Sequence, residues 1–372
     1  MNRRDFLVFI PKLSAAAWLL PRLRDNSVAE TPAEIDRLYR RVIVIDSLCA
    51  PPFLDPEHPA NAEALAAARH CGITAVNHTV SEPTFEDTVN SLAAVESLVE
   101  RYPDLFMIIR KYSEIAQAKR GSKIGIMLGF QYSAFLEEDQ ARIGTFRKLG
   151  VRIMQLTYNK HGAFGDGCLE AKDGGLTGPG RLAVKTMNDS GVAVDLSHCG
   201  YRTTSDAVRE SSKPVLITHS GCAAVYAHPR SKPDDILKAL ADRGGYFGVY
   251  LMPYLVASPT VPTREHVINH LVHAINVCGA DHVGIGSDGG IEKVVLTDAQ
   301  RTAFEADIAR RKQLGIGAPG EDRYPYVPDL NGPDHMEIIA AELAKRGQPA
   351  AVIEKVLGVN FQRVLGEIWG TA

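Results

Sequence analysis

Short apolar runs alternate with longer amphipathic stretches along most of the chain. The short runs are rich in β-branched residues, which is typical of buried strands, while the longer stretches repeat their apolar residues at helical spacing. Strands that alternate with helices predict βαβ units, and eight units favour a closed (β/α)8 TIM-type barrel over an open sheet. The eight runs are Val42–Asp46, Thr74–His78, Ile124–Gln131, Arg152–Tyr158, Val192–His198, Val215–His219, Tyr246–Tyr250 and His282–Asp288.

The stretches between these runs predict the helices that would cover such a barrel. Two further helices, Asp334–Arg346 and Ala350–Ile368, are expected to close the fold, and residues 298–329 to form a long excursion after the last strand. No segment resembles an interdomain linker, so we expect residues 30–372 to form a single barrel domain. The covering helices are expected at Ala60–Arg69, Thr88–Glu100, Asp139–Leu149, Gly180–Asp189, Thr204–Glu210, Pro233–Asp242 and Glu265–Val277.

Each apolar run ends in a polar residue. In a barrel of parallel strands, the carboxyl ends of all strands converge on one face, and active sites are found there. The sequence therefore predicts that the chemistry of this protein lies at that face. The polar residues are Asp46, His78, Gln131, Tyr158, His198, His219, Tyr250 and Asp288.

His198 and His219 end the fifth and sixth runs. Neighbouring parallel strands lie about 4.8 Å apart, so both imidazoles can reach one divalent ion, at about 2.0–2.1 Å each for zinc. Such an ion lowers the pKa of its bound water to about 7 and so provides a hydroxide at neutral pH. The alternative is a pair of strand-end histidines that bond loop carbonyls. Asp288, two strands further on, favours the metal site.

Two more residues offer chemistry at the same face. Asp288 can take the proton of a metal-bound water and pass it to a leaving amine, or it can be a turn aspartate that bonds its own backbone. Arg230, in the loop after the sixth run, can hold a substrate carboxylate through two hydrogen bonds, or it can be a solvated loop residue.

Charge and hydropathy exclude two classes of partner. The formal net charge is −3 and the body of the chain has no long basic run, which argues against a nucleic-acid partner. No apolar run approaches the roughly 20 residues that span a bilayer, so no integral membrane segment is expected. The partner expected instead is a small peptide-like substrate, and a homodimer is compatible with the sequence.

The amino-terminal segment differs from the rest. Arg3 and Arg4 precede an apolar stretch that ends near Leu20, and small residues follow at Ser27 and Ala29. This pattern predicts that residues 1–29 are a twin-arginine signal, which exports folded proteins to the periplasm. The alternative is a basic amphipathic helix.

Five stretches resemble the membrane (renal) dipeptidase family, metal-dependent barrels of the amidohydrolase superfamily. The similarity runs from about Arg41 to Trp369. It implies that His198 and His219 bind zinc, that Arg230 holds the substrate carboxylate, that Asp288 assists catalysis and that the substrate is a dipeptide. The stretches are VDLSH (194–198), PVLITHS (214–220), PRSKPDD (229–235), VGIGSDGG (283–290) and LGVNFQRVL (357–365).

The chain departs from that family at the other metal position. Leu48 and Ala50 stand where the family has a histidine and an aspartate ligand, and Gln131 stands where it has the bridging glutamate. Tyr158 stands where it has a substrate-contacting histidine, and we expect Tyr158 and its neighbour Asn159 to contact the substrate. A neutral glutamine binds a divalent ion more weakly than a carboxylate does. We therefore expect one ion rather than two, with Gln131 as a weak third ligand.

The sequence thus predicts an exported metal-dependent hydrolase that cleaves a dipeptide or a small peptide-like amide by a metal-activated water. The alternative is a metal-poor barrel that binds or modifies a small peptide-derived metabolite without hydrolysing it. The missing ligands at residues 48, 50 and 131 motivate this alternative.

Overall fold

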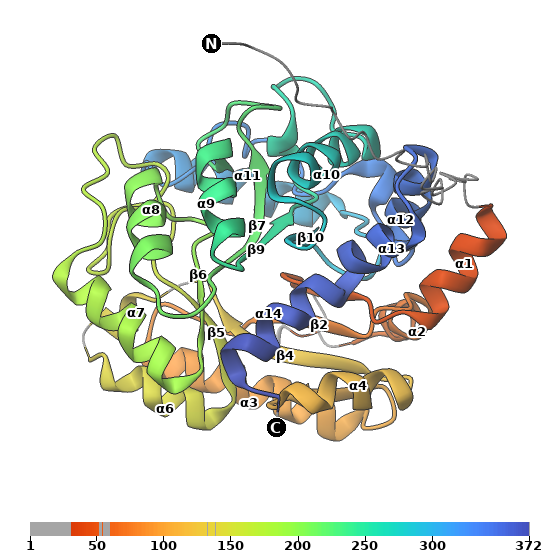
Figure 1. Ribbon diagram of the computed structural model, residues 1–372, viewed down its shortest axis with the longest axis horizontal. Coiled ribbons are helices and arrows are strands. Elements are labelled where there is room, and N and C mark those ends of the chain that lie inside the picture. The colour runs from red at the N-terminus through yellow and green to blue at the C-terminus, as the bar shows by residue number, and fades with distance from the viewer. Residues whose placement is uncertain (1–30, 52–53, 55–59, 132, 138, 372) are drawn as a thin grey trace, which may run out of the picture.

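A parallel sheet curls into a nearly closed barrel with helices around it (Figure 1). This computed structural model describes residues 31–51, 54, 60–131, 133–137 and 139–371. The predicted barrel class is confirmed. The predicted export signal, residues 1–29, lies outside the described residues.

The barrel wall matches the eight predicted runs one to one. Every pairing between neighbouring wall strands is parallel. In the order in which they pair, the strands are β1 (Ile45–Asp46), β2 (Ala75–Thr79), β4 (Ile124–Phe130), β5 (Val151–Gln155), β6 (Ala193–Asp195), β7 (Leu216–Cys222), β9 (Tyr246–Val249) and β10 (Val283–Ile285).

Two short strands lie outside this path, and the sequence pattern did not predict them. β3 (Phe106–Ile109) pairs with the amino-terminal half of β4, while β5 pairs with the carboxyl-terminal half of the same strand. β8 (Ser231–Lys232) pairs with the end of β7. Because β3 and β5 pair with the same edge of β4, β3 is not a ninth strand of the barrel wall.

Hydrogen bonds beyond the strand ends close the wall between β10 and β1. The backbone N–H of Asp288 donates to the carbonyl of Leu48 at 2.8 Å. The side chain of Asp46 accepts at Oδ1 from the backbone N–H groups of Ser287, at 2.8 Å, and Leu48, at 3.2 Å. These bonds fix the backbone on which Asp288 stands.

The barrel interior below the polar strand ends is filled by protein atoms. The Ser47 hydroxyl crosses it and donates to the carbonyls of Thr218, at 2.7 Å, and Ile285, at 2.9 Å. A Cβ atom at Gly286 would lie 2.0 Å from the Thr218 carbonyl oxygen, so only glycine allows this close approach. The site is therefore open only at the carboxyl ends of the strands.

The opposite end of the barrel is closed by α14 (Asn360–Trp369), which lies across the strands in Figure 1. Phe361, Val364 and Leu365 of this helix share one apolar cluster with strand residues such as Ile45 and Leu216. The predicted single helix over residues 350–368 is interrupted. It consists of α13 (Ala350–Glu354), a π-helical turn (Lys355–Val359) and α14, with a kink at Gly358, whose backbone angles are not helical (φ 177°, ψ −27°).

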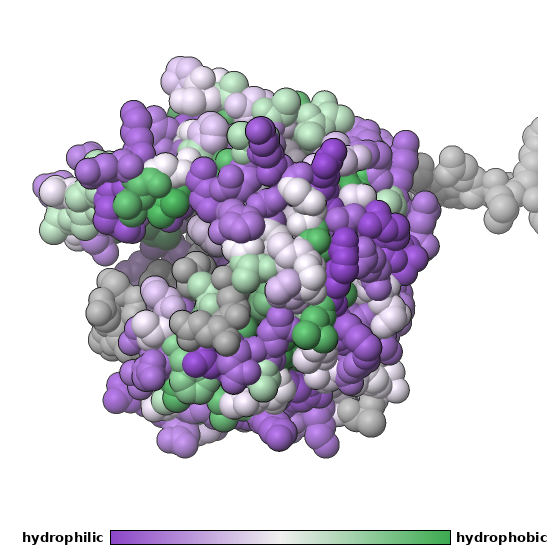
Figure 2. All heavy atoms as spheres, turned by 90° about the vertical axis from the view of Figure 1, so that its left-hand side faces the viewer, coloured by the Kyte–Doolittle hydropathy of each residue, from purple (hydrophilic) through white to green (hydrophobic). Residues whose placement is uncertain are grey.

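The remaining helices surround the wall. The face in Figure 2 is mainly hydrophilic, with small separate hydrophobic groups, as amphipathic covering helices require. Within the described parts of the chain, no helix combines the length and the apolar character needed to cross a membrane. These helices are α1 (Pro32–Arg41), α2 (Ala62–His70), α3 (Phe85–Arg101), α4 (Tyr112–Arg120), α5 (Ala134–Glu137), α6 (Ala141–Leu149), α7 (Gly178–Ser190), α8 (Tyr201–Glu210), α9 (Asp234–Asp242), α10 (Arg264–Cys278), α11 (Asp298–Gln313) and α12 (His335–Lys345).

The excursion after β10 contains a helix, α11, that the hydrophobic pattern did not reveal. None of the residues of α11 is buried, so the helix has no apolar stripe. The chain then returns over the mouth of the barrel. There the carbonyl of Ile316 accepts from Asn159 at 3.3 Å, and the carbonyl of Pro319 lies 2.8 Å from the ring nitrogen Nε2 of His228.

Candidate metal and substrate site

The structure brings four of the predicted residues together at the carboxyl ends of β4, β6, β7 and β10. The Nε2 atoms of His198 and His219 are 3.0 Å apart, with the ring centroids 5.0 Å apart. The Gln131 amide nitrogen is 3.2 Å from Nε2 of His219 and 3.3 Å from Oδ1 of Asp288. The predicted convergence of these strand ends is therefore what the structure shows.

Asn159 sets the protonation of His198. Its Oδ1 lies 2.6 Å from Nδ1 of His198, and its amide nitrogen donates to the carbonyl of Ile316, which fixes which end of the amide faces the ring. Because a carbonyl oxygen only accepts, Nδ1 of His198 carries the proton and Nε2 presents a lone pair. Asn159 thus holds the His198 ring through a hydrogen bond within the protein, and its contact with the substrate stays a prediction.

A buried carboxylate sets the protonation of His219 in the same way. The Thr218 hydroxyl donates to Oδ2 of Asp195 at 2.7 Å, so its oxygen accepts from Nδ1 of His219 at 2.9 Å. The other oxygen of Asp195 accepts from the hydroxyl of Ser197 at 2.6 Å. Nε2 of His219 therefore also presents a lone pair, toward Nε2 of His198. Sequence reasoning missed Asp195 and Thr218, although both stand in the VDLSH and PVLITHS stretches.

Both imidazoles are neutral at neutral pH. Burial, and then the positive charge of Arg230, hold the pKa values of His198 and His219 well below the ordinary histidine value. A neutral imidazole is the form that binds a metal ion. The protonation state and the direction of both rings therefore suit a shared cation.

Arg230 lies in the same mouth, with 2% of its surface exposed. Its guanidinium donates to the carbonyl of Ser197 through Nη1 and to Nε2 of His198 through Nη2, the latter at 3.1 Å. This second contact uses the lone pair that an ion would need. Ion binding thus requires the guanidinium to move away from His198, and a substrate carboxylate is the group that would draw it away.

Tyr158 packs against the first histidine. Its ring stacks on that of His198, with centroids 4.2 Å apart and an angle of 21° between the planes. The tyrosine is half-buried and lines a cavity of about 250 Å³ together with Ser133 and Lys160. Tyr158 can therefore contact a ligand while it holds the His198 ring in place.

Asp288 stands on strained backbone, with φ at 56°, a region that aspartate tolerates better than most residues. Burial raises the pKa of its carboxyl to about 6, although the charge of Arg230 acts in the opposite direction. A carboxyl with such a pKa can accept and release a proton near neutral pH. This suits the role predicted for Asp288.

The imidazoles of His198 and His219 have the spacing to hold a cation between them, with fewer protein ligands than a zinc site usually has. Two imidazole nitrogens that share a tetrahedral zinc at about 2.0–2.1 Å lie roughly 3.3 Å apart, close to the 3.0 Å between His198 and His219. Leu48 is buried and apolar and the Ala50 side chain has no donor atom, so neither of these two positions after β1 supplies a side-chain ligand. Within the described parts of the chain, no three His, Cys, Asp or Glu side chains are grouped to hold an ion. Water would complete the coordination of a single ion.

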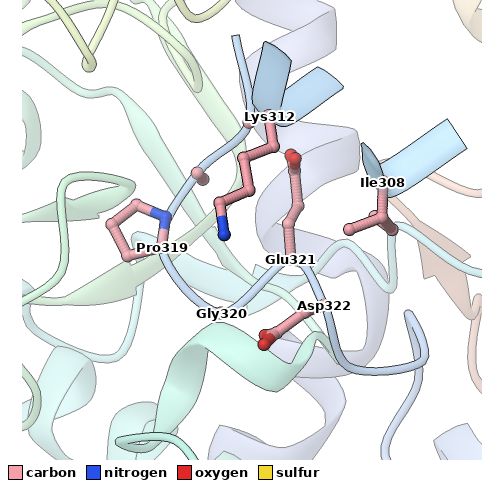
Figure 3. A pocket seen from close by; sticks show the side chains of 8 residues that line it. Ile308, Lys312, Pro319, Gly320, Glu321 and Asp322 are labelled. Carbon is pink, nitrogen blue, oxygen red and sulfur yellow. The ribbon is translucent and has the colours of Figure 1, made fainter. Parts of the chain in front are cut away.

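A cavity of about 320 Å³ lies apart from this site, between α11 and the loop that follows it (Figure 3). Its polar lining comes from Lys312, Glu321 and Asp322. None of the predicted site residues lines this cavity, so we do not assign the reaction to it.

Comparison with known proteins identifies the family. The model of the Membrane dipeptidase family (Peptidase family M19) matches residues 33–311. Dipeptidase verJ of Clonostachys rogersoniana is 31% identical over 286 residues, which cover 76% of this chain and 65% of verJ. Dipeptidase tcpJ of Claviceps purpurea is 27% identical over 292 residues, which cover 78% of this chain and 61% of tcpJ. The match thus spans less than two thirds of the length of these curated relatives.

Solved structures agree with the family match. An amidohydrolase from Pseudomonas aeruginosa is 33% identical, with a TM-score of 0.78 over 92% of this chain and 100% of that chain. The probable dipeptidase PvdM from Pseudomonas aeruginosa shares the fold, at 18% identity and a TM-score of 0.73 over 92% of this chain and 99% of that chain. The resemblance drawn from the sequence motifs is confirmed: this chain belongs to the membrane dipeptidase family, peptidase family M19.

Proposed function

We propose that this protein is a hydrolase that cleaves a dipeptide or a small peptide-like amide with the help of one divalent ion, zinc. The observation that carries this proposal is the pair of Nε2 atoms of His198 and His219, which lie 3.0 Å apart while both Nδ1 atoms are committed to neighbouring acceptors. Membership of a family of dipeptidases supports the reaction class.

Asp288, Arg230 and Tyr158 have separate roles in the proposed reaction. When bound, the ion supplies an acidified water at neutral pH. Asp288 would accept a proton on a carboxylate oxygen as the oxygen of the attacking water bonds the amide carbon, and would deliver that proton to the amide nitrogen as the C–N bond breaks. Arg230 turns from Nε2 of His198 to the carboxylate of the substrate, and Tyr158 keeps the His198 ring in place by stacking.

Metal content and turnover test this proposal together. We expect the purified protein to bind up to one ion per chain and to hydrolyse members of a dipeptide panel, because the described residues bring together two imidazole ligands and no cluster of three His, Cys, Asp or Glu side chains. The combined variant Leu48→His, Ala50→Asp, Gln131→Glu should bind a second ion. Gln313→Glu, an exposed exchange of the same kind on α11, should leave metal content unchanged.

A second candidate function is a metal-poor barrel that binds or modifies a peptide-derived metabolite. The contact of Arg230 with Nε2 of His198 favours it, since the guanidinium satisfies the nitrogen without any ion. Peptidase activity that appears only after the three ligands are restored would reject hydrolysis for the natural protein and favour this second function.

We also propose that residues 1–29 export the folded protein to the periplasm. The paired Arg3 and Arg4 ahead of an apolar stretch support this. Replacing both with lysine should retain the protein in the cytoplasm of the producing bacterium, as cell fractionation would show. The matched exchange of Arg22 and Arg24 should leave it in the periplasm. Periplasmic protein from the first variant would contradict the proposal.

A further inference from the structure

A mostly apolar cavity of about 230 Å³ lies beside the predicted catalytic carboxylate. It opens between the end of β10 and the excursion that follows. Whole-ligand sites commonly occupy about 300–1,000 Å³, so this volume suits one side chain of a substrate rather than an entire ligand. Its apolar lining includes Leu251, Val294, Leu296, Phe304, Tyr326 and Leu330.

The wall of this cavity is held in a defined shape. The Asn331 side chain bonds both backbone groups of Val294, accepting from its N–H and donating to its carbonyl, each at 2.9 Å. These two bonds tie the start of the excursion to its end. The cavity is thus a built feature of the fold, and not a gap between loosely placed loops.

The position of the cavity indicates which end of the substrate lies next to it. Asp288 and Ala50 line it, so it lies beside β10 and β1, whereas Arg230 contacts His198 beside β6 and β7. A substrate with its carboxylate at Arg230 and its amide beside Asp288 therefore turns its acyl part toward the cavity. Ala50 stands where the family has an aspartate metal ligand, so the lost ligand has left space that belongs to this cavity.

One buried polar atom of the cavity wall, Nε2 of His335, has no hydrogen-bond partner among the described residues. His335 is 2% exposed and places Nδ1 2.8 Å from the carbonyl of Gly332, so its Nε2 is an acceptor when the ring is neutral. Oδ2 of Asp46, another acceptor, lies 3.8 Å from this nitrogen, but Asp46 does not line the cavity. A hydrogen-bond donor from a ligand in the cavity would satisfy Nε2 of His335.

We propose that this cavity is the subsite for the acyl-side residue of the substrate, and that it selects a large apolar side chain with a hydrogen-bond donor at its tip, such as the phenol of tyrosine. The apolar walls contact the ring, and Nε2 of His335 accepts a hydrogen bond from the hydroxyl. This inference rests on the proposed amide hydrolysis, because it uses the substrate orientation that Arg230 and Asp288 define.

The test compares kcat/KM for Tyr-Gly, Phe-Gly and Gly-Gly. We expect Tyr-Gly to be preferred over Phe-Gly, and Phe-Gly over Gly-Gly, each by about 10-fold or more. Val294→Trp fills the cavity and should lower kcat/KM for Tyr-Gly by at least about 10-fold while leaving Gly-Gly unchanged. Val295→Trp is the matched control, because Val295 is 69% exposed next to Val294 and should change neither value.

Two further measurements separate the possible failures. His335→Phe should abolish the preference for Tyr-Gly over Phe-Gly while both remain substrates. Calorimetric binding of the same three dipeptides to the protein should follow the same order whether or not they are cleaved. Ordered binding that Val294→Trp removes, without cleavage, would reject hydrolysis and keep the subsite. Cleavage without preference for the acyl residue, or a Val294→Trp variant that is folded and unaffected, would overturn the subsite and keep hydrolysis.

Discussion

Replacing His198 with alanine is expected to remove the bound ion and to lower kcat/KM by more than about 100-fold, since changing an outer partner of a metal ligand already costs about 10–100-fold. The reason is that Nε2 of His198 and Nε2 of His219 are the two strong donors at the mouth, and one imidazole with water does not retain zinc. Metal analysis and dipeptide turnover of the purified variant measure both effects.

The control for this variant is His273→Ala. His273 lies on α10, outside the barrel mouth, and pairs with Asp234 at 2.8 Å. The His273→Ala variant removes an imidazole that does not contact the site, so its ion content and turnover should equal those of the natural protein. A His198→Ala protein that keeps its ion and its activity would show that the two histidines are structural, as the alternative interpretation of the strand ends holds.

Asp288→Asn is expected to lower kcat by about 10²–10⁴-fold while the ion stays bound, because an amide cannot carry the proton from water to the leaving nitrogen. Asparagine tolerates the positive φ of 56° at this position and can still bond Gln131, so the fold should survive. Steady-state kinetics with metal analysis separate the lost proton transfer from lost ion binding.

Asp189→Asn, an exchange of the same kind at an exposed residue of α7, is the matched control and should leave kcat unchanged. If Asp288→Asn retained the natural kcat, Asp288 would be a turn residue, whose backbone N–H serves only to bond Leu48. Loss of both ion and activity would instead place the carboxylate among the metal ligands.

Much of the site follows from the order of apolar and polar residues. A parallel strand carries its last residue to the same face as its neighbours, so His198, His219 and Asp288 had to converge once the barrel was recognised. The motifs that identified the family surround these three residues, and the barrel holds the residues of these motifs in fixed positions. Gln131 in place of a carboxylate is likewise visible in the sequence alone.

Elements without a periodic signal escaped sequence reasoning. The helix α11 buries none of its residues, and β3 is only four residues long. The hydrogen bonds of Asn159 were not predicted because its partners, His198 and Ile316, belong to segments far apart in the chain. Hydrogen bonds between loops depend on the path of each loop, which no local spacing encodes.

The sequence by itself determined the barrel, the residues at its mouth and the loss of one metal position, because strand order and residue type are local properties of the chain. Only the tertiary structure decided the rest: both histidines turn Nε2 to one point, Arg230 bonds His198, and the excursion encloses a cavity beside Asp288. These features arise from contacts between residues as distant in sequence as Ala50 and His335, whose meeting depends on how the whole chain packs.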